Sequence, residues 1–187
     1  FEQITGRKMF SRVWNNIQLL LENNFEVKIN VVAMKGIVDE EFWEFIKLTD
    51  KYPLELRFIE FMPFEGNNWN SKQVITAPEM IGWLKEKYNL EKLIDLPHAT
   101  TKKYRIAGFK GSIAFITTMS HQFCGECNRL RLTAEGKIKN CLFGKEEIDL
   151  LTELRNGSDI KPLIELSVKR KHAALGGQLA PDYQLIN

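Results

Sequence analysis

The chain concentrates all of its sulfhydryl chemistry in one short stretch, 121-HQFCGECNRLRLTAEGKIKNCLFG-144. Cys124 and Cys127 form a C-x-x-C pair, and Cys141 follows beyond a turn at residues 135–136. An odd number of cysteines argues against a secreted disulfide framework, and clustered thiols in a reducing compartment are usually metal ligands or nucleophiles. A hairpin at this turn would bring Cys141 back beside Cys124 and Cys127. The segment therefore predicts a metal centre with three thiolate ligands.

Two kinds of metal centre are compatible with three cysteines. Structural zinc requires four protein ligands, and His121 could be the fourth; the chain would then be a zinc-stabilised, non-catalytic module. An iron–sulfur cubane usually takes four cysteines, so three leave one iron open to bind a substrate atom as a Lewis acid. A redox disulfide within C-x-x-C would leave Cys141 without a role.

Two arginines follow the C-x-x-C pair at alternate positions. On a strand, Cys127, Arg129 and Arg131 would share one face, with Leu130 and Leu132 on the other. Guanidinium groups beside a thiolate centre would bind an anionic ligand in bidentate fashion. The alternative is an ordinary amphipathic strand with both arginines facing water.

The elements that would position these groups follow from the hydrophobic pattern. Helical periodicity over 7–24 and 40–51 alternates with apolar strands over 27–33 and 54–62, which predicts an α/β fold with a parallel sheet. Thr76 and Glu79 form a capping box for a further helix. After residue 100, short runs at 103–107, 112–118, 128–133 and 137–143 predict an antiparallel meander. Two closing helices are expected at 148–155 and 160–170.

Composition narrows the class of partner. Of the 187 residues, 44% are hydrophobic, as is typical of a globular domain. The net charge is only +2, so the protein has no strong overall positive potential that would attract nucleic acid or a membrane surface. We find no apolar run of membrane-spanning length and no signal peptide, so we expect a cytoplasmic protein without nucleic-acid or membrane partners.

The cysteine segment closely resembles a known family. Its C-x-x-C, N-R-x-R and C-L-F-G motifs are similar to the C-terminal cluster segment of the molybdenum cofactor biosynthesis protein A family, the radical S-adenosylmethionine GTP 3′,8-cyclases. The blocks 28-KINVVAMKG-36 and 57-RFIEFM-62 also match, in the same order. The resemblance covers most of the chain and weakens over 86–103 and after 145.

The resemblance implies a fold and a division of the chain. Residues 1–100 would be the later part of an incomplete TIM-like (βα)6 barrel. Residues 101–187 would be a cluster domain with a tail, built on an antiparallel β layer with closing helices.

The resemblance also implies a reaction. In the family, an N-terminal 4Fe-4S cluster cleaves S-adenosylmethionine, and the radical so formed takes hydrogen from the 3′ carbon of GTP. The ribose then joins C8, giving (8S)-3′,8-cyclo-7,8-dihydroguanosine 5′-triphosphate. The implied partner is the next pathway enzyme, cyclic pyranopterin monophosphate synthase, and a homodimer is left open. The N-terminal C-x-x-x-C-x-x-C motif does not occur in this sequence, so residues before Phe1 are expected to supply it and this chain alone is not expected to turn over.

The resemblance also implies roles for individual residues. The second 4Fe-4S cluster would be held by Cys124, Cys127 and Cys141. GTP would be bound by Lys28, Arg57, Arg129 and Arg131, and Met62 would lie beside the adenosyl group. From the residues alone, Lys28 and Arg57 are equally well explained as members of structural ion pairs, with Glu60 as a partner for either.

Two points remain open in this comparison. The family ends in Gly-Gly, whereas Gly176-Gly177 lie well before Asn187, so their role is not transferred. Another radical S-adenosylmethionine enzyme with an auxiliary cluster is the alternative in the same class. Three cysteines with N-R-x-R argue against its peptide-modifying members.

Overall fold

The computed structural model describes residues 1–64, 66–121 and 123–177. They form two units, one from residues 1–63 and 69–120, the other from the described residues of 64–68 and 121–177. The helices and strands of the first unit are α1 (Glu2–Thr5), α2 (Phe10–Glu22), β1 (Lys28–Ala33), α3 (Val38–Lys51), β2 (Glu55–Glu60), η1 (Ser71–Gln73), α4 (Ala77–Lys87), β3 (Leu90–Lys92), β4 (Thr101–Ile106) and β5 (Ser112–Ile116). Those of the second are η2 (Cys124–Glu126), β6 (Arg131–Leu132), β7 (Lys137–Lys139), β8 (Ile148–Asp149), α5 (Leu151–Arg155), α6 (Lys161–Lys169) and η3 (Leu175–Gly177).

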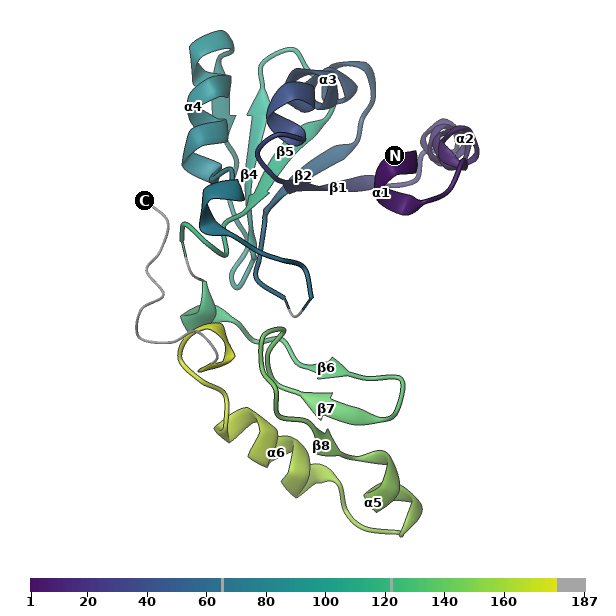
Figure 1. Cartoon of the computed structure of the whole chain (residues 1–187), viewed down its shortest axis with the longest axis vertical. Coiled ribbons are helices and arrows are strands. Elements are labelled where there is room, and N and C mark those ends of the chain that lie inside the picture. Colours follow the sequence, from purple (N-terminus) through teal and green to yellow (C-terminus); the bar gives the residue numbers. More distant parts are fainter. Residues whose placement is uncertain (65, 122, 178–187) are drawn as a thin grey trace. The chain divides into compact units, whose positions relative to one another are not determined.

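A five-stranded sheet in the order β1-β2-β5-β4-β3 organises the first unit (Figure 1). Strands β1, β2 and β5 are parallel, with Val31 opposite Phe58 and Phe58 opposite Phe115. Strands β4 and β3 extend the sheet antiparallel. The parallel α/β arrangement predicted for the opening third is confirmed.

One face of this sheet is buried beneath α3 and α4 because alternate strand residues are large and apolar. Phe42 of α3 is fully buried, and its ring lies 5.1 Å from both Phe58 on β2 and Trp83 on α4. The capping box of α4 is also confirmed, since Thr76 N donates to the Glu79 carboxylate at 2.7 Å and Glu79 N donates to Thr76 Oγ1.

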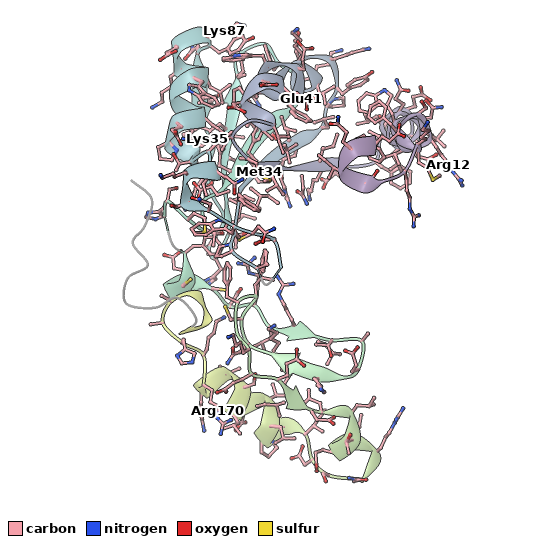
Figure 2. All side chains as sticks on the ribbon, viewed as in Figure 1. Arg12, Met34, Lys35, Glu41, Lys87 and Arg170 are labelled. Carbon is pink, nitrogen blue, oxygen red and sulfur yellow. The ribbon has the colours of Figure 1, made fainter. Side chains whose placement is uncertain are left out.

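The chain beyond β1 meets the start of α4. Met34 forms an isolated bridge with Val74, and Lys35 Nζ lies 3.2 Å from the Glu79 carboxylate (Figure 2). At the opposite end of the unit, Trp14 of α2 packs edge-on against Tyr52 at 5.9 Å. These contacts hold the end of β1 beside the start of α4, and the residues that precede β2 beside α2.

The other face of the sheet carries the alternate residues of the same strands. Lys28 and Asn30 of β1 are exposed, and Glu55 and Arg57 of β2 are partly exposed. We call the face that bears Lys28, Asn30, Glu55 and Arg57 the open face. It is the polar side of strands whose other side forms the core.

The second unit contains a three-stranded antiparallel sheet, β6-β7-β8, with α6 packed on β7. The buried Asn140 amide donates to the Ser167 carbonyl at 2.9 Å, which joins the end of the β7 segment to the helix. The β6–β7 turn needs Gly136, with φ of 75°, because a Cβ there would meet Leu151 Cβ at 2.4 Å.

The single antiparallel meander expected after residue 100 is wrong. Strands β4 and β5 join the parallel sheet of the first unit, and β6 to β8 form a sheet of their own. The reason lies in β5, where Ile113, Ala114 and Phe115 are all buried, as a strand with neighbours on both sides requires.

The helix expected over 148–155 is also partly wrong. Ile148 pairs with Ile138 in β8, and the helix begins only at Leu151. Asp149 favours this break because its carboxylate accepts from Thr152 N at 2.9 Å. In the parts of the chain that the structure describes, none of the helices has the length and apolar character needed to cross a membrane.

Candidate metal centre

The cysteine segment folds as a 3-10 turn followed by a hairpin. Cys124 opens η2, and Cys127 N donates to Cys124 O at 3.2 Å. The β6–β7 hairpin then carries the chain to Cys141, with Arg131 opposite Lys139. All three cysteines are in the thiol form, outside disulfide bonds, and are of intermediate exposure. The strand begins only at Arg131, so the common strand face expected for Cys127, Arg129 and Arg131 is not formed.

Cationic side chains surround the sulfur of Cys127. Lys171 Nζ lies 3.5 Å from Cys127 Sγ and donates to the carbonyl oxygens of Cys127 at 2.6 Å and Arg129 at 3.2 Å. Burial raises the pKa of the Cys127 thiol, but hydrogen bonds from Arg129 and the charges of Arg129 and Lys171 lower it by more. The pKa therefore falls below that of an ordinary cysteine, which favours the thiolate that binds metals.

Two glycines, Gly144 and Gly176, pack closely in the chain around Cys141. A Cβ at Gly144 would come within 3.5 Å of Cys141 Cβ, and a Cβ at Gly176 would meet Gly144 N at 2.6 Å. The segment 171–177 thus contacts the chain near two of the cysteines, through Lys171 at Cys127 and through Gly176 at Gly144, three residues after Cys141. This close approach, with φ of 67°, gives Gly176 a structural reason to be glycine.

The donor chemistry fits a thiolate-bound cluster, although the ligands are not gathered into a finished site. Among residues 1–64, 66–121 and 123–177, no three His, Cys, Asp or Glu side chains are grouped so that they could hold a metal ion. His121 is exposed in the same segment. Three thiols outside disulfide bonds, one of them with a lowered pKa, suit an iron–sulfur cluster better than a site that also needs a harder ligand.

Of the two arginines of N-R-x-R, Arg129 lies two residues before β6 and Arg131 is the first residue of β6. The Arg129 guanidinium lies over the Phe123 ring at 5.2 Å, while Arg131 is exposed on β6. Both belong to the second unit with the three cysteines. The Arg129 guanidinium borders the thiol segment, where an anionic ligand of the metal centre would be attracted.

The remaining predicted site residues lie in the first unit. Lys28 and Arg57 share the open face, and Met62 is half-buried just after β2. Arg57 Nε donates to one oxygen of Glu55, and Lys103 Nζ lies 2.6 Å from the other. Lys28 Nζ is 3.6 Å from Glu26.

Glu60, which the sequence offered as one candidate partner for Lys28 or Arg57, has other partners in the structure. It is fully buried, and its carboxylate accepts from the backbone amides of Ala77 at 2.8 Å, Met119 at 2.7 Å and Ser120 at 2.8 Å. Its position in β2 explains the difference, because Glu55 and Arg57 share one parity and Glu60 has the other.

Sequence reasoning missed Glu55, Lys103 and Lys171. Glu55 carried a usable signal, because it precedes Arg57 by two strand positions. Lys171 carried none, since 44 positions separate it from Cys127 and the contact depends on tertiary folding.

Known proteins resemble the chain over nearly its whole length. A family model described as Molybdenum Cofactor Synthesis C matches residues 54–175. "Molybdenum cofactor biosynthesis protein 1" of Mus musculus is 42% identical over 183 residues, covering 94% of this chain and 29% of that protein. The mitochondrial "GTP 3′,8-cyclase" of Arabidopsis thaliana is 42% identical over 184 residues, with coverages of 96% and 47%. The "GTP 3′,8-cyclase" of Desulforamulus reducens is 43% identical over 176 residues, with coverages of 90% and 53%. The chain spans from 29% to 53% of the length of these relatives.

Proposed function

Because the chain belongs to the molybdenum cofactor synthesis family, we propose that it is the substrate-binding part of a GTP 3′,8-cyclase. The observation that carries the proposal is the thiol segment itself, with three cysteines in the thiol form and cations at the Cys127 sulfur. The family match supports it, because residues 54–175 include all three cysteines, Arg129 and Arg131.

In this proposal the chain's own residues bind and orient the substrate. Cys124, Cys127 and Cys141 would hold a 4Fe-4S cluster, and that cluster would supply Lewis-acid chemistry toward the guanine base. Arg129 and Arg131 are well suited to bidentate recognition of phosphate or other anionic groups. Lys28 and Arg57 bring two more cations, and Glu55 holds the Arg57 guanidinium in one orientation through its hydrogen bond.

The wider reaction is proposed for the whole protein. GTP would be converted to (8S)-3′,8-cyclo-7,8-dihydroguanosine 5′-triphosphate with S-adenosylmethionine and a second 4Fe-4S cluster, and Met62 would lie beside the adenosyl group. In this scheme the first unit, with strands β1 to β5, supplies later strands of the TIM-like barrel, and the second unit supplies the cluster domain. Cyclic pyranopterin monophosphate synthase would take the product, in the cytoplasm or, as one relative's name indicates, in mitochondria. A homodimer belongs to the same proposal.

Metal loading tests the central element of the proposal. Anaerobic reconstitution of the 187-residue chain with iron and sulfide should give about four irons per chain and a cluster absorption spectrum. Replacing Cys141 by Ser should lower the iron content. One tightly bound zinc, with no uptake of iron, would instead support the zinc module and remove the cyclase assignment.

Substrate binding tests the arginines. In the iron-loaded chain, Arg129→Ala or Arg131→Ala should weaken GTP binding about 10–100-fold, as expected when a charged hydrogen bond of about 1.5–3 kcal/mol is lost. Arg155→Ala is the matched control, because Arg155 is an exposed arginine at the end of α5 in the same unit. Equal GTP affinity in all four proteins, measured by anaerobic equilibrium dialysis, would contradict the proposal.

A further inference from the structure

We propose that Lys171 is a positioning residue for the cluster, which fixes the Cys127 ligand arm and raises the reduction potential of the bound centre. The inference rests on the cluster binding of the proposed function. It goes beyond that function by assigning a residue outside the N-R-x-R and C-x-x-C motifs to the control of the metal centre.

The first step of the argument is the saturation of the Lys171 ammonium group. An ammonium has three N–H donors, and Lys171 Nζ has three acceptors within 3.5 Å. Two are the carbonyl oxygens of Cys127 and Arg129, which lie on either side of Asn128. The third is Cys127 Sγ. One side chain therefore holds both the backbone and the sulfur of the same ligand.

The second step is the rigidity of the segment that delivers Lys171. The backbone N–H of Lys171 donates to Val168 O at 3.1 Å, so Lys171 follows directly from the last turn of α6. The helix is joined to the β7 segment by the buried hydrogen bond from Asn140 to Ser167. The ammonium is thus presented to Cys127 from a supported helix end.

The third step is the contrast with the neighbouring cations. Lys169 and Arg170 are exposed, and the guanidinium of Arg170, which is labelled in Figure 2, lies 3.9 Å from the Glu146 carboxylate. Lys171 is half-buried, and lysines that leave water usually do so to pair with a polar or charged group. The pattern separates Lys171 from the solvated end of the helix.

The chemical consequence follows from charge. A donor and a positive charge at a ligating sulfur stabilise the electron-rich, reduced form of a cluster more than its oxidised form. Since its three donors are engaged by Cys127 and Arg129, Lys171 acts on the ligand and not as a contact to substrate. Removing it should make the centre harder to reduce.

The test compares Lys171→Met, Lys171→Arg and the control Lys169→Met in the anaerobically reconstituted 187-residue chain. The midpoint potential is measured by titration with dithionite, monitored by electron paramagnetic resonance, at matched iron content. We expect a more negative potential for Lys171→Met, recovery toward the wild-type value for Lys171→Arg, and no change for Lys169→Met. An unchanged potential in Lys171→Met would overturn the inference.

A second measurement tests, without iron, whether Lys171 holds the backbone at Cys127 and Arg129 in place; we call this set of contacts the clamp. Hydrogen–deuterium exchange of the metal-free chain should quicken over residues 127–131 in Lys171→Met and stay at the wild-type rate in Lys169→Met. Equal exchange in both variants would overturn the clamp. If Lys171→Met fails to take up iron, restored uptake in Lys171→Arg supports the inference and continued failure contradicts it. A wild-type chain that takes up no iron removes the proposed function, and the exchange arm still decides whether the clamp exists.

Discussion

Glu55 shows how one carboxylate can arrange two cations on the open face. Its side chain is 10% exposed, and its two oxygens contact Arg57 and Lys103 separately. Burial raises the pKa of Glu55, but hydrogen bonds and charges from Lys103 and Arg57 lower it by more, so the pKa lies below that of an ordinary glutamate. The carboxylate is therefore kept ionised between its two partners.

The lowered pKa predicts how stability depends on pH. A carboxylate with a lowered folded-state pKa stabilises the fold at pH above its unfolded-state pKa of about 4.3, and this stabilisation is lost as the pH falls through the folded-state pKa. Glu55→Gln should therefore lower the free energy of unfolding at pH 7 by about 1–3 kcal/mol and flatten its decline in acid.

Urea unfolding between pH 7 and pH 3 measures both effects. Glu44→Gln is the matched control, because Glu44 pairs with Lys47 on the exposed surface of α3 and surface pairs contribute about 0–1 kcal/mol. If the acid dependence of Glu55→Gln parallels that of the wild type, the Glu55 pair does not govern this pH dependence.

At the scale of elements, Glu60 joins three pieces of the first unit. It lies at the end of β2, accepts from the first residue of α4, and accepts from Met119 and Ser120 beyond β5. Ser120 is also the last residue of the first unit before the chain continues toward the cysteine segment. A single buried carboxylate thus closes the carboxyl ends of two parallel strands.

Replacing this carboxylate with an amide should be costly. Glu60→Gln turns an acceptor oxygen into an NH₂ group that faces backbone donors, which should lower the free energy of unfolding by about 2–3 kcal/mol. Glu86→Gln, on the exposed side of α4, should change it by less than about 0.5 kcal/mol. Thermal and urea unfolding of the two variants compares them directly, and equal stabilities would contradict the account of Glu60.

Local patterns predicted those elements whose causes are local. The alternation of Lys28 and Val31 on β1 and the Thr76–Glu79 capping box depend on neighbours within a few positions, and the structure confirms them. The parallel pairing of β5 with β2 was not predicted, because the hydrophobic run at 112–116 suits a hairpin and a sheet centre equally well. The metal site was inferred from cysteine spacing, whereas the Lys171 contact depends on where α6 ends.

At the scale of the whole molecule, the two units differ in the size of their cores. The first unit buries an aromatic cluster around Phe42, Phe58 and Phe115. In the described part of the chain, the second unit contributes Ile138 and Leu150 to the buried apolar residues. Small domains with thin cores usually need a metal or disulfide to be stable, and Cys124, Cys127 and Cys141 form no disulfide.

Iron loading should therefore stabilise the second unit selectively. A cluster that bridges Cys124, Cys127 and Cys141 binds the folded hairpin and not the unfolded chain, so binding adds directly to the folding free energy. On reconstitution, amide exchange should slow over residues 124–144 and 171–177, while β1, β2 and β5 keep their metal-free rates.

A thermal transition assigned to the second unit should rise by more than about 5 °C, the shift expected for roughly 1 kcal/mol in a domain of this size. Repeating the measurement with Cys141→Ser supplies the control, because that variant loses one ligand and should show a smaller shift. Equal protection of both units on iron binding would mean that the cluster does not act as the missing core of the second.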